Sequence, residues 1–347
     1  MILCINVISS EGKRPIITDR PEQSKALNFG LGELKKGTLY LDPIEALYLY
    51  EIKGFGAESP DSLLDSIEGS LDRYIVFRDL STRGYKAGLR SEPKGSPKEP
   101  KPYKGEKASF KGSKINGAAS KGLVICEGGK DLYSEYWFGQ HGVYKREGLG
   151  SSLILDQFEA EFLRRLGLLK YSGELKKLRY FDEYFRIYSE WRELGFILKS
   201  GFKFGGDFRI YFPGTTPSNF DHSKHVMQVF PEKYTIEAGE WARAVRISHG
   251  IRKTFILAIP ELVSKLPFKP DMFAEREGAA YAVKVFYEAD VISGRALHSA
   301  LSYCAEKGMD MLIAIVDRDT SVSYYTVERV MLEGSKNMYF EIGWFRP

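Results

Sequence analysis

Residues 153–160, LILDQFEA, occur a second time in altered form, as LYLDPIEA at residues 39–46. In both versions an aspartate precedes a segment with helical apolar spacing and a glutamate follows three residues later, which is typical of a helix N-terminus. Further along, residues 74–85 match residues 185–196, and each segment predicts a helix that ends at a glycine. The chain therefore contains two copies of a helical module, which we call the N lobe.

A second duplication lies nearer the C-terminus, where residues 229–259 match residues 285–315. The first copy predicts one amphipathic helix and three strands, at residues 236–249, 203–212, 225–230 and 255–259. We call this module the C lobe, a small mixed sheet with a helix packed on it. Two duplications with different spacings indicate duplicated modules rather than a solenoid. The predicted fold class is therefore α/β, built from α+β modules in the order N, N–C, C.

A segment rich in Lys, Pro, Gly and Ser separates the first N lobe from the rest of the chain. Residues 91–121 hold eight lysines, three glutamates and almost no aliphatic side chains. Such a composition cannot bury enough apolar surface to offset chain entropy, so we predict a solvated linker. We predict a structural half-unit at residues 1–90, followed by the linker at 91–121. A complete unit follows at 122–264, with its N lobe at 122–184 and its C lobe at 185–264. A second structural half-unit occupies residues 265–347.

Composition excludes several classes of protein. The 347 residues suffice for two or three cores, and no apolar run is long enough to span a bilayer. Three widely spaced cysteines argue against a zinc ribbon or a disulfide framework, and no secretory signal is evident, so we expect a cytoplasmic protein. The net charge of +4 comes from the linker, so any polyanion site must be a local cluster.

Comparison of the two C lobes selects three candidates for chemistry. At the spacing of this duplication, Tyr211, His222 and Lys253 correspond to Pro267, Gly278 and Met309. A polar group used only for folding would be expected to survive in both copies, as the packing residues do. Taken singly, each candidate also has a structural interpretation: a sheet aromatic, a surface histidine and an exposed lysine. The interpretation of His225 and His249 is structural.

Three blocks around these candidates resemble the archaeal tRNA-splicing endonucleases. The blocks are SGFKFGGDFRIY, HSKHV and ARAVRISHGIRK, at residues 200–211, 222–226 and 242–253. The N-lobe segments are also similar to the first domain of that family. One departure is Ser248-His249, where the family more often has Ala-His. Some forms of the family fuse a split N-terminal half, a full catalytic unit and a C-terminal structural half, which resembles the module order found here.

The resemblance implies a reaction and a role for each candidate. The family cuts precursor tRNA at a bulge–helix–bulge and leaves a 2′,3′-cyclic phosphate and a 5′-hydroxyl. It needs no metal and no cofactor, because the RNA's own 2′-hydroxyl attacks. Tyr211 would be the base, His222 the acid and Lys253 the cation at the phosphorane. An ordinary tyrosine ionises near pH 10, so a basic role needs nearby positive charge, which Lys253 or Arg252 could supply.

The resemblance also suggests contacts with RNA. It implies that Arg246, seven residues before Lys253, stacks on a flipped-out bulge base. Arg243 and Arg252 would contact phosphates. The alternative for Arg246 and Arg243 is a solvated helix face with generic phosphate contacts. Lys176 and Lys177 lie in the segment 171–177, which is either a plain surface loop or an extra RNA contact that broadens specificity.

One triad per chain and two cuts per substrate predict a C2 homodimer acting on precursor tRNA, with neither a membrane nor DNA as partner. The acidic segment 317–319 resembles the family's loop that docks into a partner's catalytic unit. Two alternatives remain. A non-catalytic RNA-binding subunit would bind RNA without cutting it. A metal-dependent nuclease would need clustered carboxylates, which the C lobe lacks.

Overall fold

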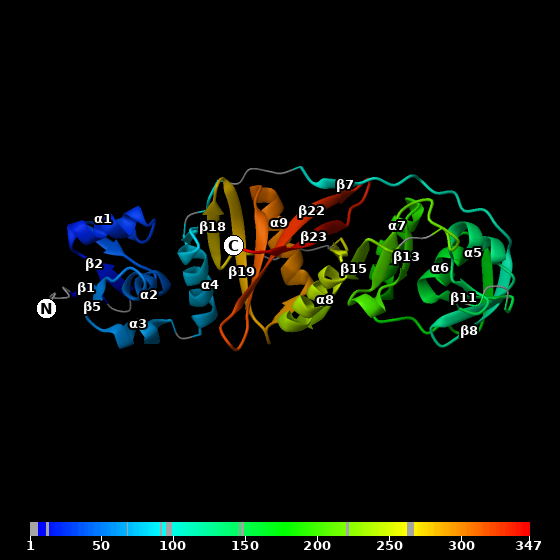
Figure 1. Ribbon diagram of the computed structural model, residues 1–347, viewed down its shortest axis with the longest axis horizontal. Helices are drawn as coiled ribbons and strands as arrows, with labels where there is room; N and C mark the ends of the chain where they lie inside the picture. Colours follow the sequence, from blue (N-terminus) through cyan, green and yellow to red (C-terminus); the bar gives the residue numbers. More distant parts are fainter. Residues whose placement is uncertain are drawn as a thin grey trace.

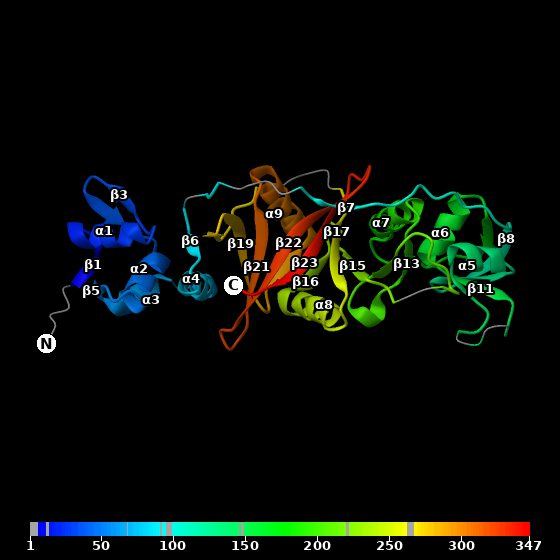
Figure 2. The same ribbon diagram turned by 45° about the horizontal axis from the view of Figure 1, so that its top comes forward.

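The computed structural model describes residues 6–11, 14–67, 69–90, 92–94, 99–144, 146, 149–219, 222–261 and 267–347. The molecule is elongated, with one N lobe at each end and a large sheet between them (Figures 1 and 2). This mixed α+β architecture confirms the predicted fold class. Within the described ranges, no helix is long and apolar enough to cross a membrane.

The two N lobes share one topology. The sheet of the first lobe has the order β3-β4-β2-β1-β5, and the sheet of the second has the order β10-β11-β9-β8-β12. Strands β1 to β5 therefore occupy the same places as β8 to β12, in the same chain order. The first lobe comprises β1 (Asn6–Glu11), β2 (Arg14–Ile17), α1 (Arg20–Asn28), β3 (Glu33–Lys35), β4 (Thr38–Tyr40), α2 (Pro43–Glu51), β5 (Gly56–Ala57) and α3 (Pro60–Ser66). The second comprises β8 (Ile115–Ser120), β9 (Leu123–Glu127), α5 (Lys130–Tyr136), β10 (Gln140–His141), β11 (Ser152–Asp156), α6 (Gln157–Arg165) and β12 (Leu169–Ser172). The N-lobe duplication is therefore present in three dimensions, and each lobe has a sheet besides the expected helices.

The repeated aspartates cap the helices that the sequence predicted. Asp42 precedes α2 and Asp156 precedes α6, and each forms a capping box with the glutamate three residues on. The Asp156 carboxylate accepts from the backbone N–H groups of Phe158 and Glu159, while the Glu159 carboxylate accepts from the N–H of Asp156. These bonds satisfy N–H groups that have no partner within the helix.

One sheet runs through the middle of the molecule and joins both C lobes. Its strand order is β13-β14-β15-β17-β23-β22-β21-β19-β18-β6, with β7 paired to β22. The strands are β6 (Lys86–Gly88), β7 (Lys101–Tyr103), β13 (Ile197–Ser200), β14 (Phe208–Tyr211), β15 (His225–Val229), β17 (Thr254–Ile259), β18 (Met272–Arg276), β19 (Ala279–Tyr287), β21 (Asp310–Val316), β22 (Val322–Leu332) and β23 (Met338–Phe345). The remaining elements are α4 (Leu71–Thr82), α7 (Phe181–Glu193), the 3₁₀ turn η1 (Phe202–Phe204), β16 (Thr235–Glu237), α8 (Ala238–Gly250), β20 (Val291–Ser293) and α9 (Gly294–Lys307).

The large sheet has an internal pseudo-two-fold axis. Phe255 of β17 pairs with Ile342 of β23, whereas Met311 of β21 pairs with Val327 of β22. Val327 and Ile342 also pair with each other, so the axis passes between them. The strands β16 and β20 pair across the same axis. Strand β23 thus completes the sheet of the first C lobe, although the second C lobe separates them in the chain.

The segments at 1–90 and 265–347, predicted as two half-units, pack together. Strand β6 pairs with β18, and α4 lies against β19 and β21. Their side chains share one core, in which Tyr74 and Phe77 cluster with Met272 and Val283. The N–C arrangement of residues 115–259 is thereby repeated by two segments distant in the chain.

The prediction that all of residues 91–121 form a solvated linker is wrong at two places. Residues 101–103 form β7, and residues 115–120 form β8, an interior strand of the second N lobe. Few aliphatic side chains are needed in β8, because β9 and β12 supply its backbone hydrogen-bond partners. At Gly117 a Cβ would lie 2.8 Å from the Cys126 sulfur, so a small residue suits this strand. Residues 99–100 and 104–114 of the linker run along one side of the molecule (Figure 2).

Candidate active site

The ends of three neighbouring strands meet at one edge of the large sheet. Strand β14 is antiparallel to β15, and β15 is parallel to β17. The C-terminal end of β14 therefore lies beside the N-terminal ends of β15 and β17. These ends carry Tyr211, the segment that leads from His222 into β15, and Lys253. The sheet topology thus brings together three segments that are far apart in the sequence.

Lys253 is held by the segment that contains His222. Its side chain is buried, and its Nζ donates to the Ser223 carbonyl oxygen and, at 3.0 Å, to the Ser223 hydroxyl. The ammonium lies 5.3 Å from the centre of the Phe204 ring. Burial, and secondly the charge of Arg209, lower the pKa of Lys253. His222 itself is exposed beside Ser223, as a group that meets a substrate must be.

Tyr211 is buried at the end of β14, with contacts that the sequence analysis did not foresee. The Arg209 guanidinium donates from Nη1 to the Tyr211 hydroxyl at 3.2 Å, so a cation reaches the phenol from its own strand. The Trp137 ring, from the second N lobe, packs on the Tyr211 ring with centroids 4.8 Å apart. Trp137 has a φ of +52°, and the carbonyls of Tyr136 and Gly139 on either side accept from Arg192 and Lys199.

Arg209 could have been found from the strand period. Residues two apart on a strand point to the same face, so the Arg-Ile-Tyr sequence at 209–211 places Arg209 beside Tyr211 once this segment is known to be extended. The sequence predicted one interrupted strand at 203–212, whereas the chain forms η1 first and β14 only from Phe208. No sequence signal connects Trp137 with Tyr211, because their contact depends on how the lobes pack.

The expected RNA-contact residues are all exposed, and they lie on α8, just after α8, or beyond β12. Arg243 and Arg246 are exposed on α8, and the Arg246 guanidinium approaches the Tyr325 hydroxyl at 3.4 Å. Arg252 is exposed and lines a surface pocket of about 410 Å³ together with Lys253 and Trp344. Lys176 and Lys177 are exposed in the segment that follows β12 (Leu169–Ser172) of the second N lobe.

The second C lobe gives a different counterpart for Tyr211 from the one that the sequence predicted. Phe208 pairs with Met227, and Met272 pairs with Val283, so β18 is the structural equivalent of β14. Tyr211 therefore corresponds to Glu275, and the expected correspondence with Pro267 is wrong. A constant spacing fails here because the connection 212–224, which carries His222, is reduced to the two-residue turn Glu277-Gly278. Met309 does take the place of Lys253, since β21 is the equivalent of β17.

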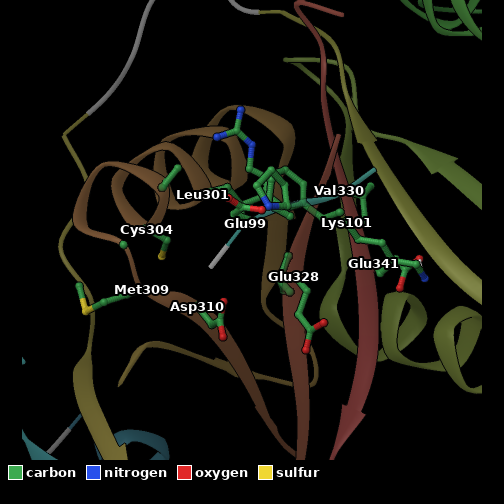
Figure 3. Close-up of a pocket in the computed structure, with 15 residues that line it drawn as sticks. Glu99, Lys101, Leu301, Cys304, Met309, Asp310, Glu328, Val330 and Glu341 are labelled. Atoms are coloured by element: carbon green, nitrogen blue, oxygen red, sulfur yellow. Dashed lines mark hydrogen bonds and ion pairs between the residues drawn. The ribbon is translucent and has the colours of Figure 1, made fainter. Parts of the chain in front are cut away.

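The pocket beside Met309 is the counterpart of the pocket beside Lys253 (Figure 3). Gly308 and Met309 replace Arg252 and Lys253, and the carboxylates of Asp310 and Glu328 also line it. Residues 99–101 of the linker form one wall, leaving a cavity of about 170 Å³. The Lys101 ammonium pairs with Glu341 at 2.8 Å. Arg252 and Lys253 therefore have no cationic counterpart at positions 308 and 309, although Lys101 and Arg329 line this pocket.

Comparison with known proteins identifies the same part of the chain. A family model described as the catalytic C-terminal domain of tRNA intron endonuclease matches residues 181–266. The tRNA-splicing endonuclease of Pyrobaculum aerophilum is 33% identical over 37% of this chain and 79% of its own length. That of Pyrobaculum arsenaticum is 34% identical over 38% of this chain and 81% of its own length. That of Haloarcula marismortui is 32% identical over 39% of this chain and 42% of its own length. The C lobe 185–264 is thus similar to an endonuclease catalytic domain. The chain belongs to the tRNA-splicing endonuclease family.

Proposed function

We propose that this endonuclease excises introns from precursor tRNA by cutting at bulge–helix–bulge motifs. The RNA 2′-hydroxyl is the nucleophile, and the products carry 2′,3′-cyclic phosphate and 5′-hydroxyl ends. The observation that supports this proposal most is the single sheet edge shared by Tyr211, the His222 segment and Lys253. Its counterpart in the second C lobe has none of the three residue types.

Each member of the triad has one step in the proposed reaction. Tyr211 takes the proton from the 2′-hydroxyl, and the 2′-oxygen forms a bond to phosphorus. The bond between phosphorus and the 5′-oxygen then breaks, and His222 gives that oxygen a proton. Lys253 stabilises the negative charge that develops on the phosphate oxygens. A buried ammonium is suited to this role, because its charge is less screened by water than an exposed one.

RNA contacts outside the triad form a second part of the proposal. Arg246 stacks on an unpaired base, and Arg243 and Arg252 contact phosphates near the same helix. Exposure of all three on or just after α8 supports these roles. Lys176 and Lys177 make an additional contact from the segment that follows β12.

Substitution of Lys176 and Lys177 tests that additional contact directly. In the double variant Lys176→Ala/Lys177→Ala, we expect cleavage of a regular bulge–helix–bulge RNA to stay within about twofold of the wild type. Cleavage of an RNA with a relaxed bulge should fall roughly tenfold, because two phosphate contacts are lost. Equal rates on the relaxed RNA would show that 171–177 is a plain surface loop.

We also propose that two chains form a C2 homodimer, which would present two triads to the two cuts of one substrate. The acidic loop after β21 supports this arrangement. The Asp317 carboxylate accepts from the N–H groups of Asp319 and Ser321, which fixes the loop before any partner binds. The cytoplasmic location expected from the cysteine pattern stays a prediction.

The test of the proposed function is cleavage of an end-labelled bulge–helix–bulge RNA in EDTA, with wild type beside His222→Ala. We expect cyclic-phosphate ends from the wild type and a rate lower by about 10² to 10⁴ in the variant. RNA binding without cleavage by the wild type would instead indicate a non-catalytic subunit. Cleavage that requires added Mg²⁺ would contradict the proposed mechanism.

A further inference from the structure

We propose that Arg209 is a further catalytic residue, whose guanidinium binds a non-bridging oxygen of the scissile phosphate beside Lys253. This inference rests on the proposed function and adds a fourth residue to it. It starts from the position of Arg209 on β14, two residues before Tyr211 and on the same face of the sheet.

The Arg209 guanidinium is fixed in place by groups that carry no full charge. Its Nε donates to the Ser200 carbonyl oxygen at 2.7 Å, and its Nη1 donates to the Tyr211 hydroxyl at 3.2 Å. The guanidinium carbon lies 5.4 Å from the centre of the Phe204 ring. Among the described residues, no carboxylate forms an ion pair with this guanidinium. Within the part of the chain that the structure describes, the positive charge of Arg209 is therefore available to a bound anion.

A second cation lies on the same aromatic ring. The Lys253 ammonium is 5.3 Å from the Phe204 ring centre, and it is held by the neutral Ser223. The charge of Arg209 contributes to the lowered pKa of Lys253, as expected for two like charges close together. Two cations gathered with no carboxylate partner among the described residues disfavour the folded state unless an anion binds between them. A phosphate group of RNA is such an anion, and its oxygens match the planar N–H donors of arginine.

The neighbouring strand supplies an internal contrast. Lys199 pairs with Arg209 in the register of β13 and β14, so it also approaches this part of the sheet. Its ammonium lies 2.7 Å from the Glu159 carboxylate, which neutralises it. Lys199 therefore has a carboxylate partner, whereas no carboxylate of the described residues pairs with Arg209. Because Ile210 pairs with His225, the exposed Lys224, just before β15, lies beside the end of β14 that carries Tyr211.

The duplicated C lobe shows that Arg209 is lost together with the triad. Its structural counterpart on β18 is Phe273, next to Glu275 and Met309 in the places of Tyr211 and Lys253. The core-facing neighbours Phe208 and Ile210 correspond to Met272 and Ala274, which stay apolar and buried. A residue required only for packing would be expected to follow those neighbours. Arg209 is instead absent from the second C lobe, as the three triad residues are.

The test compares Arg209→Gln and Arg209→Lys with the wild type and with Arg186→Gln, which removes an exposed arginine from α7. Single-turnover cleavage is measured in EDTA at saturating enzyme, with RNA binding and thermal unfolding measured in parallel. We expect Arg209→Gln to cut roughly 10² to 10³ more slowly, with RNA affinity within about threefold of the wild type. Arg209→Lys should recover part of the rate, and Arg186→Gln should behave as the wild type.

Phosphorothioate RNA distinguishes phosphate contact from a purely structural role. Sulfur in place of one non-bridging oxygen at the scissile phosphate should slow the wild type, and this effect should shrink in Arg209→Gln. A wild-type rate in Arg209→Gln, or an undiminished sulfur effect in a slow but folded variant, would overturn the inference. An active wild type beside either result contradicts this inference alone. A wild type that binds RNA without cutting it contradicts the proposed function as well.

Discussion

At the scale of single residues, His225 shows how much the face of a strand changes the chemistry of a histidine. It lies three residues after the exposed His222, but its ring is buried against Tyr103 and Phe212. Its Nδ1 lies 3.4 Å from the Tyr103 hydroxyl. Burial lowers the pKa of His225 to about 4, against a partial opposing effect from Glu341. The structural interpretation of this histidine follows from that environment.

The lowered pKa of His225 predicts a loss of stability in mild acid. Below pH 6.5 the unfolded chain binds a proton at this histidine, whereas the folded chain does not until about pH 4. Its contribution should therefore be complete above about pH 7 and fall by about 2 kcal/mol at pH 5. Urea unfolding of wild type and His225→Phe at pH 7.5 and 5 measures this difference. Equal losses in both proteins would contradict the prediction, and His249→Gln serves as the control.

The residue types at the sheet edge could be predicted from sequence, and their surroundings could not. Tyr211, His222 and Lys253 stand out because their counterparts in the second C lobe are not polar groups of the same kind. Arg209 is hard to select from the sequence, because its pairing with the Tyr211 hydroxyl depends on where β14 begins. The contact of Trp137 with Tyr211 could not be predicted, because only the packing of the second N lobe brings the two rings together.

At the scale of elements, the turn between β18 and β19 marks the largest local change between the two C lobes. Glu277 and Gly278 have φ values of +54° and +83°, the signs of a type I′ hairpin turn. Such a turn joins two strands with the least possible chain. It therefore leaves no room for a loop like 212–224, and with it no place for a catalytic histidine.

Two substitutions in this turn should change the stability of the protein in opposite directions. Glu277→Asn should stabilise the protein by about 0.5 to 1 kcal/mol, because Asn-Gly is the preferred type I′ pair. Gly278→Ala should destabilise it by about 1 kcal/mol or more, because a Cβ is strained at this φ. Urea unfolding gives both values, and cleavage activity is the control, since the turn lies outside the proposed active site. The same sign for both variants would contradict the assignment of the turn.

The capping boxes predict a matched loss in the two N lobes. Asp42→Ala and Asp156→Ala should each lower the free energy of unfolding by about 1 kcal/mol, because each leaves helix N–H groups without a partner. Both aspartates accept from the N3 backbone N–H of a capping box, so the two losses should be similar. Chemical denaturation of each variant measures them, and a loss at only one aspartate would contradict this match.

Helix N-termini were predictable because capping is local, and the strands of the N lobes were not. Aspartate and glutamate three residues apart carry the whole signal for α2 and α6. Strand β8 carries almost none, since Gly117, Ala118 and Ala119 form a strand only where β9 and β12 flank them. The linker prediction failed at this strand for that reason.

At the scale of the whole molecule, the proposed dimer depends on charge at one loop. Asp317→Lys/Asp319→Lys should reduce the mass in light scattering from about twice the chain mass of 39.4 kDa to that of one chain. Cleavage should fall with it, because one substrate then meets one triad. The exposed pair Asp61 and Asp65 on α3, changed in the same way, should leave the mass unchanged. A dimer that survives the loop variant would place the interface elsewhere.

The union of α4 and β6 with β18 and β19 also has a consequence for protein synthesis. About 190 residues separate Ala87 from its strand partner Ala274, and all of them must leave the ribosome before the two can pair. At the usual speed of translation this takes roughly 10 to 40 s. During that time the apolar face of α4, with Tyr74 and Phe77, has no partner from the sheet. The nascent chain must therefore carry an unfinished hydrophobic surface through most of its own translation, which is the condition in which chaperones bind.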